Sequence, residues 1–407
     1  MRLQESLDSK HHGATEVPYS LYHPFMDPTR FVAPSMGEVV PVIGQDGLYH
    51  AFVPTPLPRM LDLESATVLA MSKADNALGR LAGAGRLLPN PHILVAPYVV
   101  REAVSSSAIE GTQTSISELY RAEASGREER GDVLEVRNYV RALNEGLRLL
   151  PTLPISKRLT AEIHRILLTG VRGRERTPGE FRVTQNFIGS PDDRPTSAIF
   201  VPPPPGEPME RALADWERFH HEDVLLPLLV RCALLHYQFE TIHPFLDGNG
   251  RLGRLLIVFF LVEQGALPSP LLYLSAYFEQ RRTDYNDHLQ AVRETGAMQA
   301  WLRFFLRGVE AQATDAVARA ERLSDVRERY RHALAGSRSR AAEVIDLLIE
   351  SPVATGPGVS SRLGMTWQGA KNLLGQLQAK GIVRPYETSP GGRKSWVADE
   401  ILTIVSD

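Results

Sequence analysis

Residues 243–254, HPFLDGNGRLGR, constrain the fold of this chain more than any other stretch of the sequence. The apolar segment before them, LLPLLVRCALLHYQF, has the spacing of a helix, and so has RLGRLLIVFFLVEQG, which begins within them. Gly248, Gly250 and Gly253 stand where the second helix begins, which leaves backbone N–H groups free to hold an anion. The sequence therefore predicts two helices joined by an anion-binding loop.

The same glycines have the spacing of a dinucleotide-binding fingerprint, G-x-G-x-x-G. That fingerprint follows a strand inside a β-α-β unit, whereas a Leu-rich helical pattern precedes the glycines here. The stretch also contains a histidine, a carboxylate and two arginines that a dinucleotide site does not need. The sequence therefore disfavours a Rossmann fold.

The composition is ordinary for a globular protein, with 407 residues, 43% of them hydrophobic and 23% charged. The net charge of −3 predicts no general attraction to nucleic acid or anionic membranes. A single cysteine, Cys232, excludes an internal disulfide and lies in an apolar run that favours a buried thiol. Residues 1–13 lack the apolar segment of a signal peptide, and the apolar run 255–262 is too short to span a membrane, so we expect a cytoplasmic protein.

Most of the chain is expected to be α-helical. Helical periodicity covers residues 62–88, 96–108, 132–150, 156–169, 208–222, 225–240, 251–264, 275–292 and 298–332. Residues 1–57 show little periodicity and predict an extended N-terminal arm. Residues 184–205 contain two β-prone runs around a turn rich in Pro, Asp and Ser, which predicts a β-hairpin.

The tail, residues 337–407, is expected to form a separate winged helix-turn-helix domain, because three helical patterns precede an alternating segment with a Gly-Gly turn. It contains eight lysines and arginines and seven aspartates and glutamates, and this small positive net charge is weak for binding DNA. Arg393 and Lys394 on the wing and Lys371 in the third helix keep DNA binding open beside protein docking or dimer support.

The polar residues of the 243–254 stretch suit phosphate chemistry. Asp247, beside the glycines, can bind a divalent cation that accompanies a phosphate chain. Arg251 and Arg254 lie one helical turn apart, so both can face the phosphates. His243 can accept the proton of an attacking hydroxyl, since histidine titrates near neutral pH. Transfer of a phosphate-containing group needs little more than these functions.

The stretch resembles the signature of the Fic (Fido) family, HPFx[D/E]GN[G/K]RxxR, at all of its constrained positions. Residues 22–28, YHPFMDP, share only HPFxD and are interpreted as structural. The resemblance implies a mainly α fold, a Fic-type helical bundle with a small β-hairpin flap, plus the winged helix-turn-helix domain. The expected domains are an N-terminal arm (1–57), a helical module with an inhibitory helix (58–125), a Fic core (126–312), a helical connector (313–336) and the winged helix (337–407).

The resemblance further implies a protein adenylyltransferase that transfers AMP from ATP to a Ser, Thr or Tyr hydroxyl of a target protein, including this protein itself. His243 would be the general base, and Asp247 would hold Mg²⁺. Arg251 would support the phosphates and Arg254 would bind the γ-phosphate. The anion cradle would consist of Gly248, Asn249 and Gly250. The edge of the flap would bind the target as an added strand through Phe187, Ile188, Gly189, Ile199, Phe200 and Val201.

SSAIEG at 106–111 resembles the family's inhibitory pattern, [S/T]xxxE[G/N], with Ser106, Glu110 and Gly111 at its constrained positions. A Glu110 carboxylate that reached Arg254 would take the place of the γ-phosphate, because two anions do not share one guanidinium comfortably. ATP would then bind in an orientation unsuited to in-line attack. The resemblance therefore implies an autoinhibited enzyme.

Arg281 departs from the family, many of whose members have Asn at this position near the expected adenine pocket, so the preferred nucleotide is left open. Three alternatives to AMP transfer also stay open. They are removal of AMP with Glu110 positioning a water, transfer of another phosphate-containing group, and a nucleotide-sensing DNA-binding regulator, which would not need the base His243. Formation of a homodimer is left open as well.

Two further groups of histidines are interpreted as structural. His220 and His221 precede an acidic pair, but adjacent side chains on a helix diverge, so a solvated helix end is expected in place of a metal cluster. His236 lies on the helix that leads into the 243–254 stretch and is expected to be packed and hydrogen-bonded.

Overall fold

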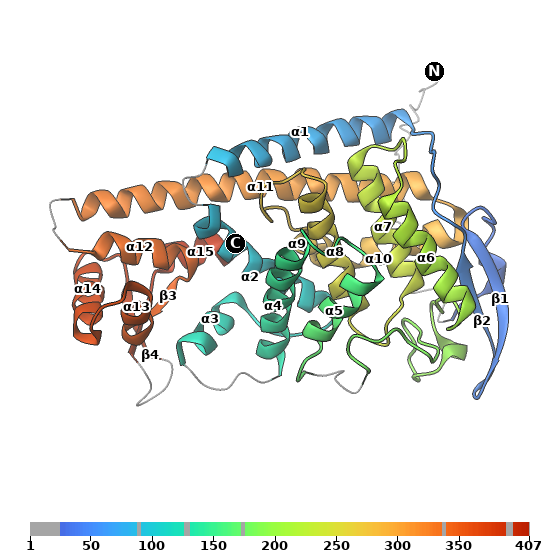
Figure 1. The fold of residues 1–407 in the computed structure, drawn as a ribbon, viewed down its shortest axis with the longest axis horizontal. Helices are drawn as coiled ribbons and strands as arrows, with labels where there is room; N and C mark the ends of the chain where they lie inside the picture. The colour runs from blue at the N-terminus through green and yellow to red at the C-terminus, as the bar shows by residue number, and fades with distance from the viewer. Residues whose placement is uncertain are drawn as a thin grey trace, which may run out of the picture.

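The computed structural model describes residues 25–87, 91–125, 131–171, 176–335, 339–387 and 394–406. Its α-helices, shown in Figure 1, are α1 (Ser65–Leu87), α2 (Pro91–Ile109), α3 (Ile116–Ser125), α4 (Asp132–Leu149), α5 (Lys157–Leu167), α6 (Glu207–His221), α7 (Leu228–Ile242), α8 (Asn249–Glu263), α9 (Ser275–Gln280), α10 (Arg282–Thr295), α11 (Met298–Ala333), α12 (Ala341–Glu350), α13 (Gly356–Leu363), α14 (Trp367–Ala379) and α15 (Asp399–Ser406). The other elements are the 3₁₀ helices η2 (Pro28–Arg30) and η3 (Pro195–Ser197) and the strands β1 (Gly37–Gly44), β2 (Gly47–Pro54), β3 (Val353–Thr355), β4 (Arg384–Glu387) and β5 (Lys394–Val397).

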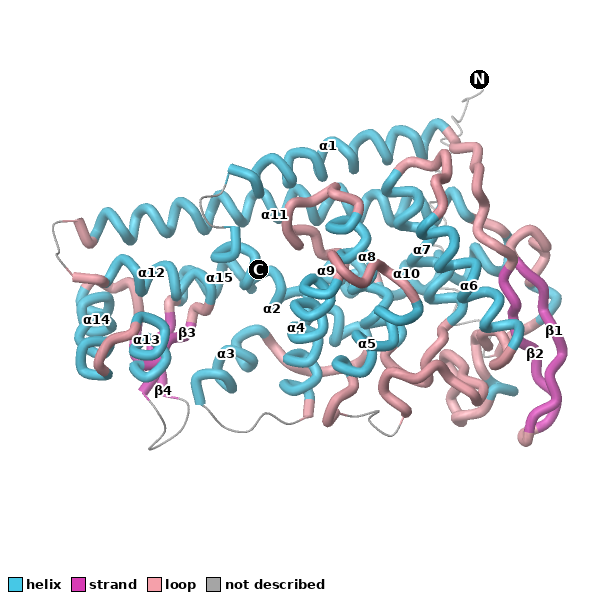
Figure 2. Tube along the Cα trace, in the orientation of Figure 1, coloured by secondary structure: helices cyan, strands magenta, loops and turns pink. Residues whose placement is uncertain are grey.

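The mainly α fold class is confirmed, and Figure 2 shows how few strands accompany the helices. One expected helix, over 275–292, is interrupted, because α9 ends at Gln280 and α10 begins at Arg282. The sequence analysis did not predict α3 or α15. Each has at most ten residues, a length at which helical periodicity is hard to distinguish from a loop.

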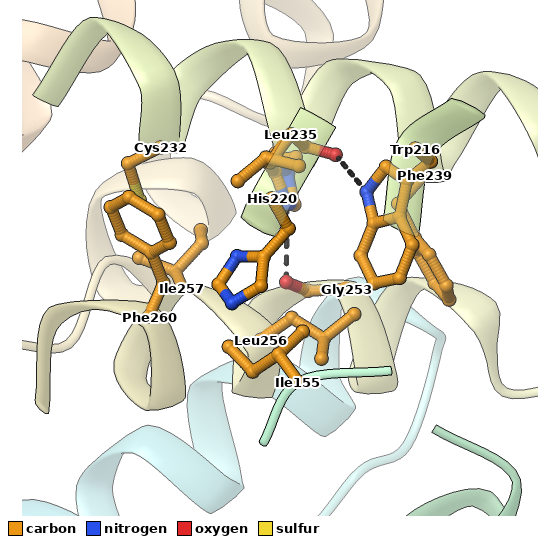
Figure 3. Close-up of a pocket in the computed structure, with 11 residues that line it drawn as sticks. Ile155, Trp216, His220, Cys232, Leu235, Phe239, Gly253, Leu256, Ile257 and Phe260 are labelled. Carbon is orange, nitrogen blue, oxygen red and sulfur yellow. Dashed lines mark hydrogen bonds between the residues drawn. The ribbon is translucent and has the colours of Figure 1, made fainter. Parts of the chain in front are cut away.

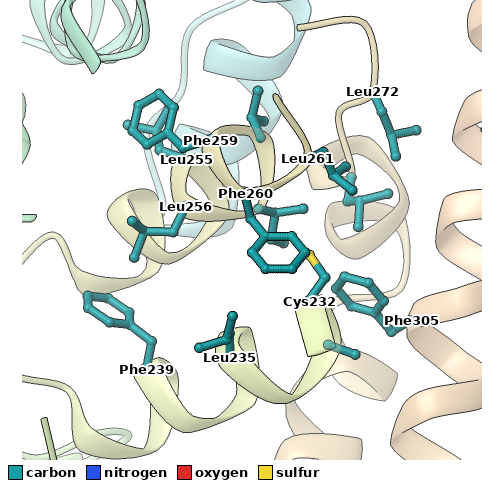
Figure 4. Packing of buried hydrophobic residues seen from close by; sticks show 14 of the residues in the cluster. Cys232, Leu235, Phe239, Leu255, Leu256, Phe259, Phe260, Leu261, Leu272 and Phe305 are labelled. Carbon is teal, nitrogen blue, oxygen red and sulfur yellow. The ribbon is translucent and has the colours of Figure 1, made fainter. Parts of the chain in front are cut away.

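The longest helices, α1 and α11, lie side by side along one side of the molecule (Figures 1 and 2). Beneath them α7 and α8 pack together in the largest hydrophobic core, which α4 and α5 also line. Figure 4 shows part of this core, with Cys232 of α7 among Phe260 and Phe305. Burial raises the pKa of the Cys232 thiol, so the residue is an unreactive part of the core, as the sequence predicts.

The expectation of an extended N-terminal arm is wrong for residues 37–54, which form the antiparallel hairpin of β1 and β2; residues 1–24 lie outside the described residues. Gly44 pairs with Gly47 across a two-residue turn, and the flanking runs EVVPVI and LYHAFV are rich in β-branched and aromatic residues. The hairpin shares a small core with residues 198–201, into which Phe52 and Phe200 are buried. The N-terminal hairpin therefore supports the segment predicted to form the flap.

The C-terminal segment forms a second hydrophobic core with α12, α13, α14 and a sheet in the order β3-β5-β4. This order of elements supports a winged helix, which stays a prediction; Arg393 and the Gly-Gly turn lie outside the described residues. Ile116 and Tyr120 of α3 are buried in the same core, and Val100 and Val104 of α2 pack against it. The expected boundary at residues 312–313 falls inside the continuous helix α11.

Among the described residues, no helix combines the length and the apolar character that crossing a membrane requires.

The close packing of α4 against α8 predicts a specific sensitivity at Gly146. A Cβ there would lie 2.1 Å from Cζ of Phe259, so Gly146→Ala should lower the free energy of unfolding by about 1–3 kcal/mol. Gly79, in the middle of α1, is the matched control, because a Cβ there meets nothing within 4 Å. Gly79→Ala should raise the free energy of unfolding by up to about 1 kcal/mol, since alanine favours the helix. Urea denaturation measures both, and a neutral Gly146→Ala would contradict the packing of these helices.

Candidate active site

The 243–254 stretch is a tight loop between two buried helices. Helix α7 ends at Ile242, and His243 adopts a left-handed conformation with φ 48°. Gly248, with φ 76°, precedes the first residue of α8. The left-handed conformation is uncommon for a residue with a side chain, so the surroundings must hold His243 in it.

Two polar side chains, Arg182 just before the predicted flap and Asn186 within it, provide that support. The carbonyl of His243 accepts hydrogen bonds from Nε of Arg182 at 3.0 Å and from Nδ2 of Asn186 at 2.9 Å. Asn186 also donates to the carbonyl of Phe245 at 2.7 Å. Arg182 is almost completely buried, and burial lowers its pKa to about 10. The sequence analysis missed both residues, because nothing in their local pattern distinguishes them from ordinary loop residues.

Asn249 and His164 fix the middle of the loop. The side-chain amide of Asn249 accepts from the N–H of Phe245 at 2.9 Å and donates to its carbonyl at 2.8 Å. Nδ1 of His164 accepts from the N–H of Gly179, so its Nε2 donates to the carbonyl of Asp247, at 2.8 Å. Burial lowers the pKa of His164 to about 4, which keeps it neutral. The side chain of Asn249 therefore shapes the loop, and its place in the anion cradle stays a prediction.

The buried Arg254 binds the segment that the sequence analysis singled out as inhibitory. Its guanidinium donates to Oγ of Ser106 at 2.8 Å, to the carbonyl of Ser106 at 2.9 Å and to Oε1 of Glu110 at 2.8 Å. Burial opposes ionisation of Glu110, but the charge of Arg254 holds the pKa of this carboxyl below its ordinary value. A Cβ on Gly250 would lie 2.2 Å from Oε1 of Glu110, so the glycine makes room for the contact.

Gly111 gives α2 the ending that places Glu110. Its φ is 92°, and its N–H donates to the carbonyl of Ala108, while the N–H of Thr112 donates to that of Ser107. A left-handed residue after the last helical turn is a common helix ending that favours glycine. The chain therefore turns directly after Glu110 and leaves its side chain beside Arg254.

Arg251 has different partners from Arg254, although the two lie one turn apart. Its guanidinium lies 3.5 Å from Oε2 of Glu135 and 3.5 Å from Oδ1 of Asp247. Nε of Arg251 is buried without a hydrogen-bond partner among the described residues. An unpartnered buried donor beside a helix N-terminus fits an anionic ligand.

A cavity of about 360 Å³ adjoins Arg254 and is lined by eight of the seventeen predicted site residues. Its lining consists of Phe25, Arg30, Ile109, Glu110, Ile188, Gly189, Ile199, Phe200, Glu240, His243, Gly250, Arg254, Arg282, Tyr285, Asn286, Asp287, Leu289, Gln290, Arg293 and Glu294. The predicted site residues outside this lining are Ser106, Gly111, Phe187, Val201, Asp247, Gly248, Asn249, Arg251 and Arg281. Burial lowers the pKa of His243 to about 4, so its imidazole is neutral at pH 7 and able to accept a proton.

The predicted hairpin at the mouth of this cavity is smaller than expected. Its two runs are joined by one isolated β-bridge between Ile188 and Phe200. The N–H of Ile188 donates to the carbonyl of Phe200 at 2.8 Å, and the N–H of Phe200 donates to the carbonyl of Ile188 at 3.2 Å. The N–H of Phe52 in β2 donates to the carbonyl of Val201, which extends the support from the N-terminal hairpin. Proline at 195 and at 202–205 explains the short pairing, since proline has no N–H to donate.

Arg281 does not line the cavity. Its side chain lies over the ring of Tyr277, 4.3 Å from the centroid, at the break between α9 and α10. The next residue, Arg282, and Asn286 line the cavity in its place. The departure from the family at position 281 therefore lies beside the cavity, outside its wall.

Asp247 is the residue proposed to bind a cation, and its side chain is 40% exposed. The described residues contain no cluster of three His, Cys, Asp or Glu side chains that could hold a metal ion. Mg²⁺ commonly binds through one or two carboxylates together with substrate phosphates and water. A single accessible aspartate beside the loop fits that mode of binding.

A second cavity, of about 20 Å³, lies between α6, α7 and α8 and has room for roughly one water molecule (Figure 3). The expectation of a solvated helix end is wrong for His220, which is buried there with Nε2 2.5 Å from Oε2 of Glu263. His236 is packed as expected, because its Nε2 contacts the hydroxyl of Tyr285 at 2.8 Å. This cavity is too small for a nucleotide.

Comparisons with known proteins agree with the sequence signature. The model described as Fic/DOC family N-terminal matches residues 68–148, and that described as Fic/DOC family matches residues 154–261. The protein adenylyltransferase Fic of Nematostella vectensis is 30% identical over 214 residues, 50% of this chain and 45% of that protein. The protein adenylyltransferase Fic of Drosophila willistoni is 27% identical over 246 residues, which are 60% of this chain and 44% of that protein. This chain therefore spans less than half the length of these curated relatives.

Among solved structures, a crystal structure of a Fic family protein from Desulfovibrio desulfuricans G20 is similar with a TM-score of 0.54 and 20% sequence identity. The superposition covers 83% of this chain and 97% of that one. This likeness shows that the two chains share a fold.

The loop geometry predicts that Asn249 matters for folding as well as for binding. Asn249→Ala removes both hydrogen bonds between this side chain and Phe245, and the buried N–H of Phe245 then lacks the Oδ1 acceptor. We expect the free energy of unfolding to fall by about 1–3 kcal/mol. Gln368→Ala on the exposed face of α14 is the control and should change it by less than about 0.5 kcal/mol. Urea denaturation compares the two variants, and an equally small effect of Asn249→Ala would contradict its role in the loop.

Proposed function

Because this chain belongs to the Fic/DOC family, we propose that it is a protein adenylyltransferase, which transfers AMP from ATP to a hydroxyl side chain of a protein. The observation that carries the proposal is the cavity in which His243, Gly250 and Arg254 meet beside the N-terminus of α8. It combines a neutral base, a buried arginine and the positive end of a helix dipole. These are the parts that transfer of a phosphate-containing group requires.

In the proposed reaction the phosphates of ATP lie against the first N–H groups of α8, and Arg254 binds the γ-phosphate. The target hydroxyl gives its proton to His243 while its oxygen bonds to the α-phosphorus. The bond between that phosphorus and the oxygen bridging to the β-phosphate breaks, and pyrophosphate leaves with the electron pair. His243 then releases the proton to solvent. Arg251, whose buried Nε has no hydrogen-bond partner among the described residues, would support the phosphates.

Asp247 would hold Mg²⁺, which would neutralise phosphate charge when bound. Its partial exposure and its position directly before Gly248 support this assignment.

We propose that Glu110 inhibits this reaction. Its carboxylate occupies the face of Arg254 that a γ-phosphate would use, and Ser106 binds the rest of the guanidinium. The side chain of Glu110 is 37% exposed and lines the cavity, so its carboxylate would be able to leave Arg254 without unfolding α2. The flap edge at Ile188, Gly189 and Ile199 would bind the target segment as an added strand.

Labelled ATP tests the proposed function. Wild-type protein, Glu110→Gly and His243→Ala are incubated with Mg²⁺ and ATP labelled at either the α- or the γ-phosphate. We expect α-label in protein, with at least about tenfold more in Glu110→Gly, since a charge-assisted hydrogen bond of ~1.5–3 kcal/mol no longer competes with ATP. His243→Ala, combined with Glu110→Gly, should incorporate none.

The matched control is Gln113→Gly, which adds the same backbone freedom to the same segment without removing the carboxylate. Its incorporation should equal that of wild type. Transfer of γ-label would support a kinase-like reaction, and release of AMP from a modified protein without forward transfer would support the reverse reaction. Either result would contradict the proposal.

A further inference from the structure

We propose that Glu240 is a positioning residue for His243, whose carboxylate orients the imidazole and stabilises the imidazolium that forms when it accepts a proton. This inference rests on the proposed AMP transfer. Glu240 lies on the last turn of α7, and Nδ1 of His243 is 3.3 Å from its carbonyl and 3.9 Å from its Oε2. With two acceptors facing it, Nδ1 carries the proton, so Nε2 is the nitrogen free to act as base.

The surroundings of Glu240 are those of a functional carboxyl group. Its side chain lines the cavity and is only 8% exposed, yet Oε1 has no hydrogen-bond partner among the described residues. Buried polar groups are hydrogen-bonded in most structures, so an orphaned oxygen in a cavity wall indicates a role beyond packing. A Cβ on Gly253 would lie 2.3 Å from Oε1, so the third glycine of the G-x-G-x-x-G spacing makes room for this carboxyl.

Burial and the groups near three helices, α2, α8 and α10, decide when Glu240 ionises. Burial raises its pKa to about 7, Glu110 at the end of α2 adds to this, and Arg254 of α8 and Arg293 of α10 oppose it. The hydroxyl of Tyr285 on α10 also faces it. Burial lowers the pKa of His243 to about 4, so the imidazole stays neutral in this range and the titration near pH 7 belongs to Glu240.

The sign of the pH dependence follows. Below pH 7 Glu240 is neutral and cannot stabilise the imidazolium. As the pH rises through about 7 it ionises, and the transfer rate should rise with it. Glutamine at position 240 cannot ionise, so the rise near pH 7 should disappear.

The experiment uses the full chain with Glu110→Gly, so that inhibition does not obscure the rate. Without the Glu110 charge, which raises the pKa of Glu240, the rise in this protein should lie below pH 7. Adding Glu240→Gln should lower kcat about 10- to 100-fold, leave KM for ATP nearly unchanged, and remove that rise. Glu240→Asp keeps a carboxylate and should retain a rise, shifted in pH. The control Glu294→Gln removes another buried carboxyl of the cavity wall and should keep the rise with pH whatever its rate. An unchanged pH profile in Glu240→Gln would overturn the inference while leaving AMP transfer intact.

A second measurement does not depend on activity. In the NMR spectrum of the full-length protein, the imidazole of His243, assigned by its loss in His243→Ala, should be the Nδ1–H tautomer. It should show a step near pH 7 that is absent in Glu240→Gln. If the step is present but no AMP is transferred, the proposed function fails and the coupling stands. If the step persists in Glu240→Gln, the inference is wrong.

Discussion

The hydrogen bonds of Arg254 are the interaction on which the site depends. A guanidinium buried to 2% exposure has to find acceptors, and here they come from Ser106 and Glu110, far away in the sequence. Burial by itself would lower the pKa of Arg254, but the Glu110 carboxylate raises it above its ordinary value. The same arginine therefore joins α2 to α8 in the resting protein and, once Glu110 leaves, offers a charge to an anion. The Glu110 carboxylate and the phosphate proposed to bind here would therefore occupy the same position beside Arg254.

A network of hydrogen bonds fixes the loop that carries the base. Arg182 and Asn186 hold the carbonyl of His243, while Asn249 closes on Phe245. These contacts leave the His243 side chain facing the cavity in a strained backbone conformation. The position of α2 ties this site to the rest of the molecule, because Val100 and Val104 pack against the core of the C-terminal segment. Helix α2 thus connects that core to Arg254.

The sequence predicted the parts of this arrangement that local patterns encode. The two helices around the loop follow from apolar periodicity, and the contact between Glu110 and Arg254 follows from two short motifs. The β1–β2 hairpin had a signal in its β-branched runs, but its prolines and glycines suggested an irregular arm. His164, Arg182 and Glu240 had no such signal, because their roles come from residues that only the fold brings near. The sequence did not show that Arg282 lines the cavity while Arg281 lies beside it, because the break between α9 and α10 separates the two residues.

The central claim is that Glu110 and a γ-phosphate compete for Arg254, and calorimetric binding of ATP and ADP tests it directly. In wild-type protein, where Glu110 holds the guanidinium, the account predicts that ATP and ADP bind with nearly equal Kd. In Glu110→Gly, ATP should bind about tenfold or more tightly than ADP, because the γ-phosphate gains a charge-assisted contact. The same ratio of the two Kd values in both proteins would contradict the account.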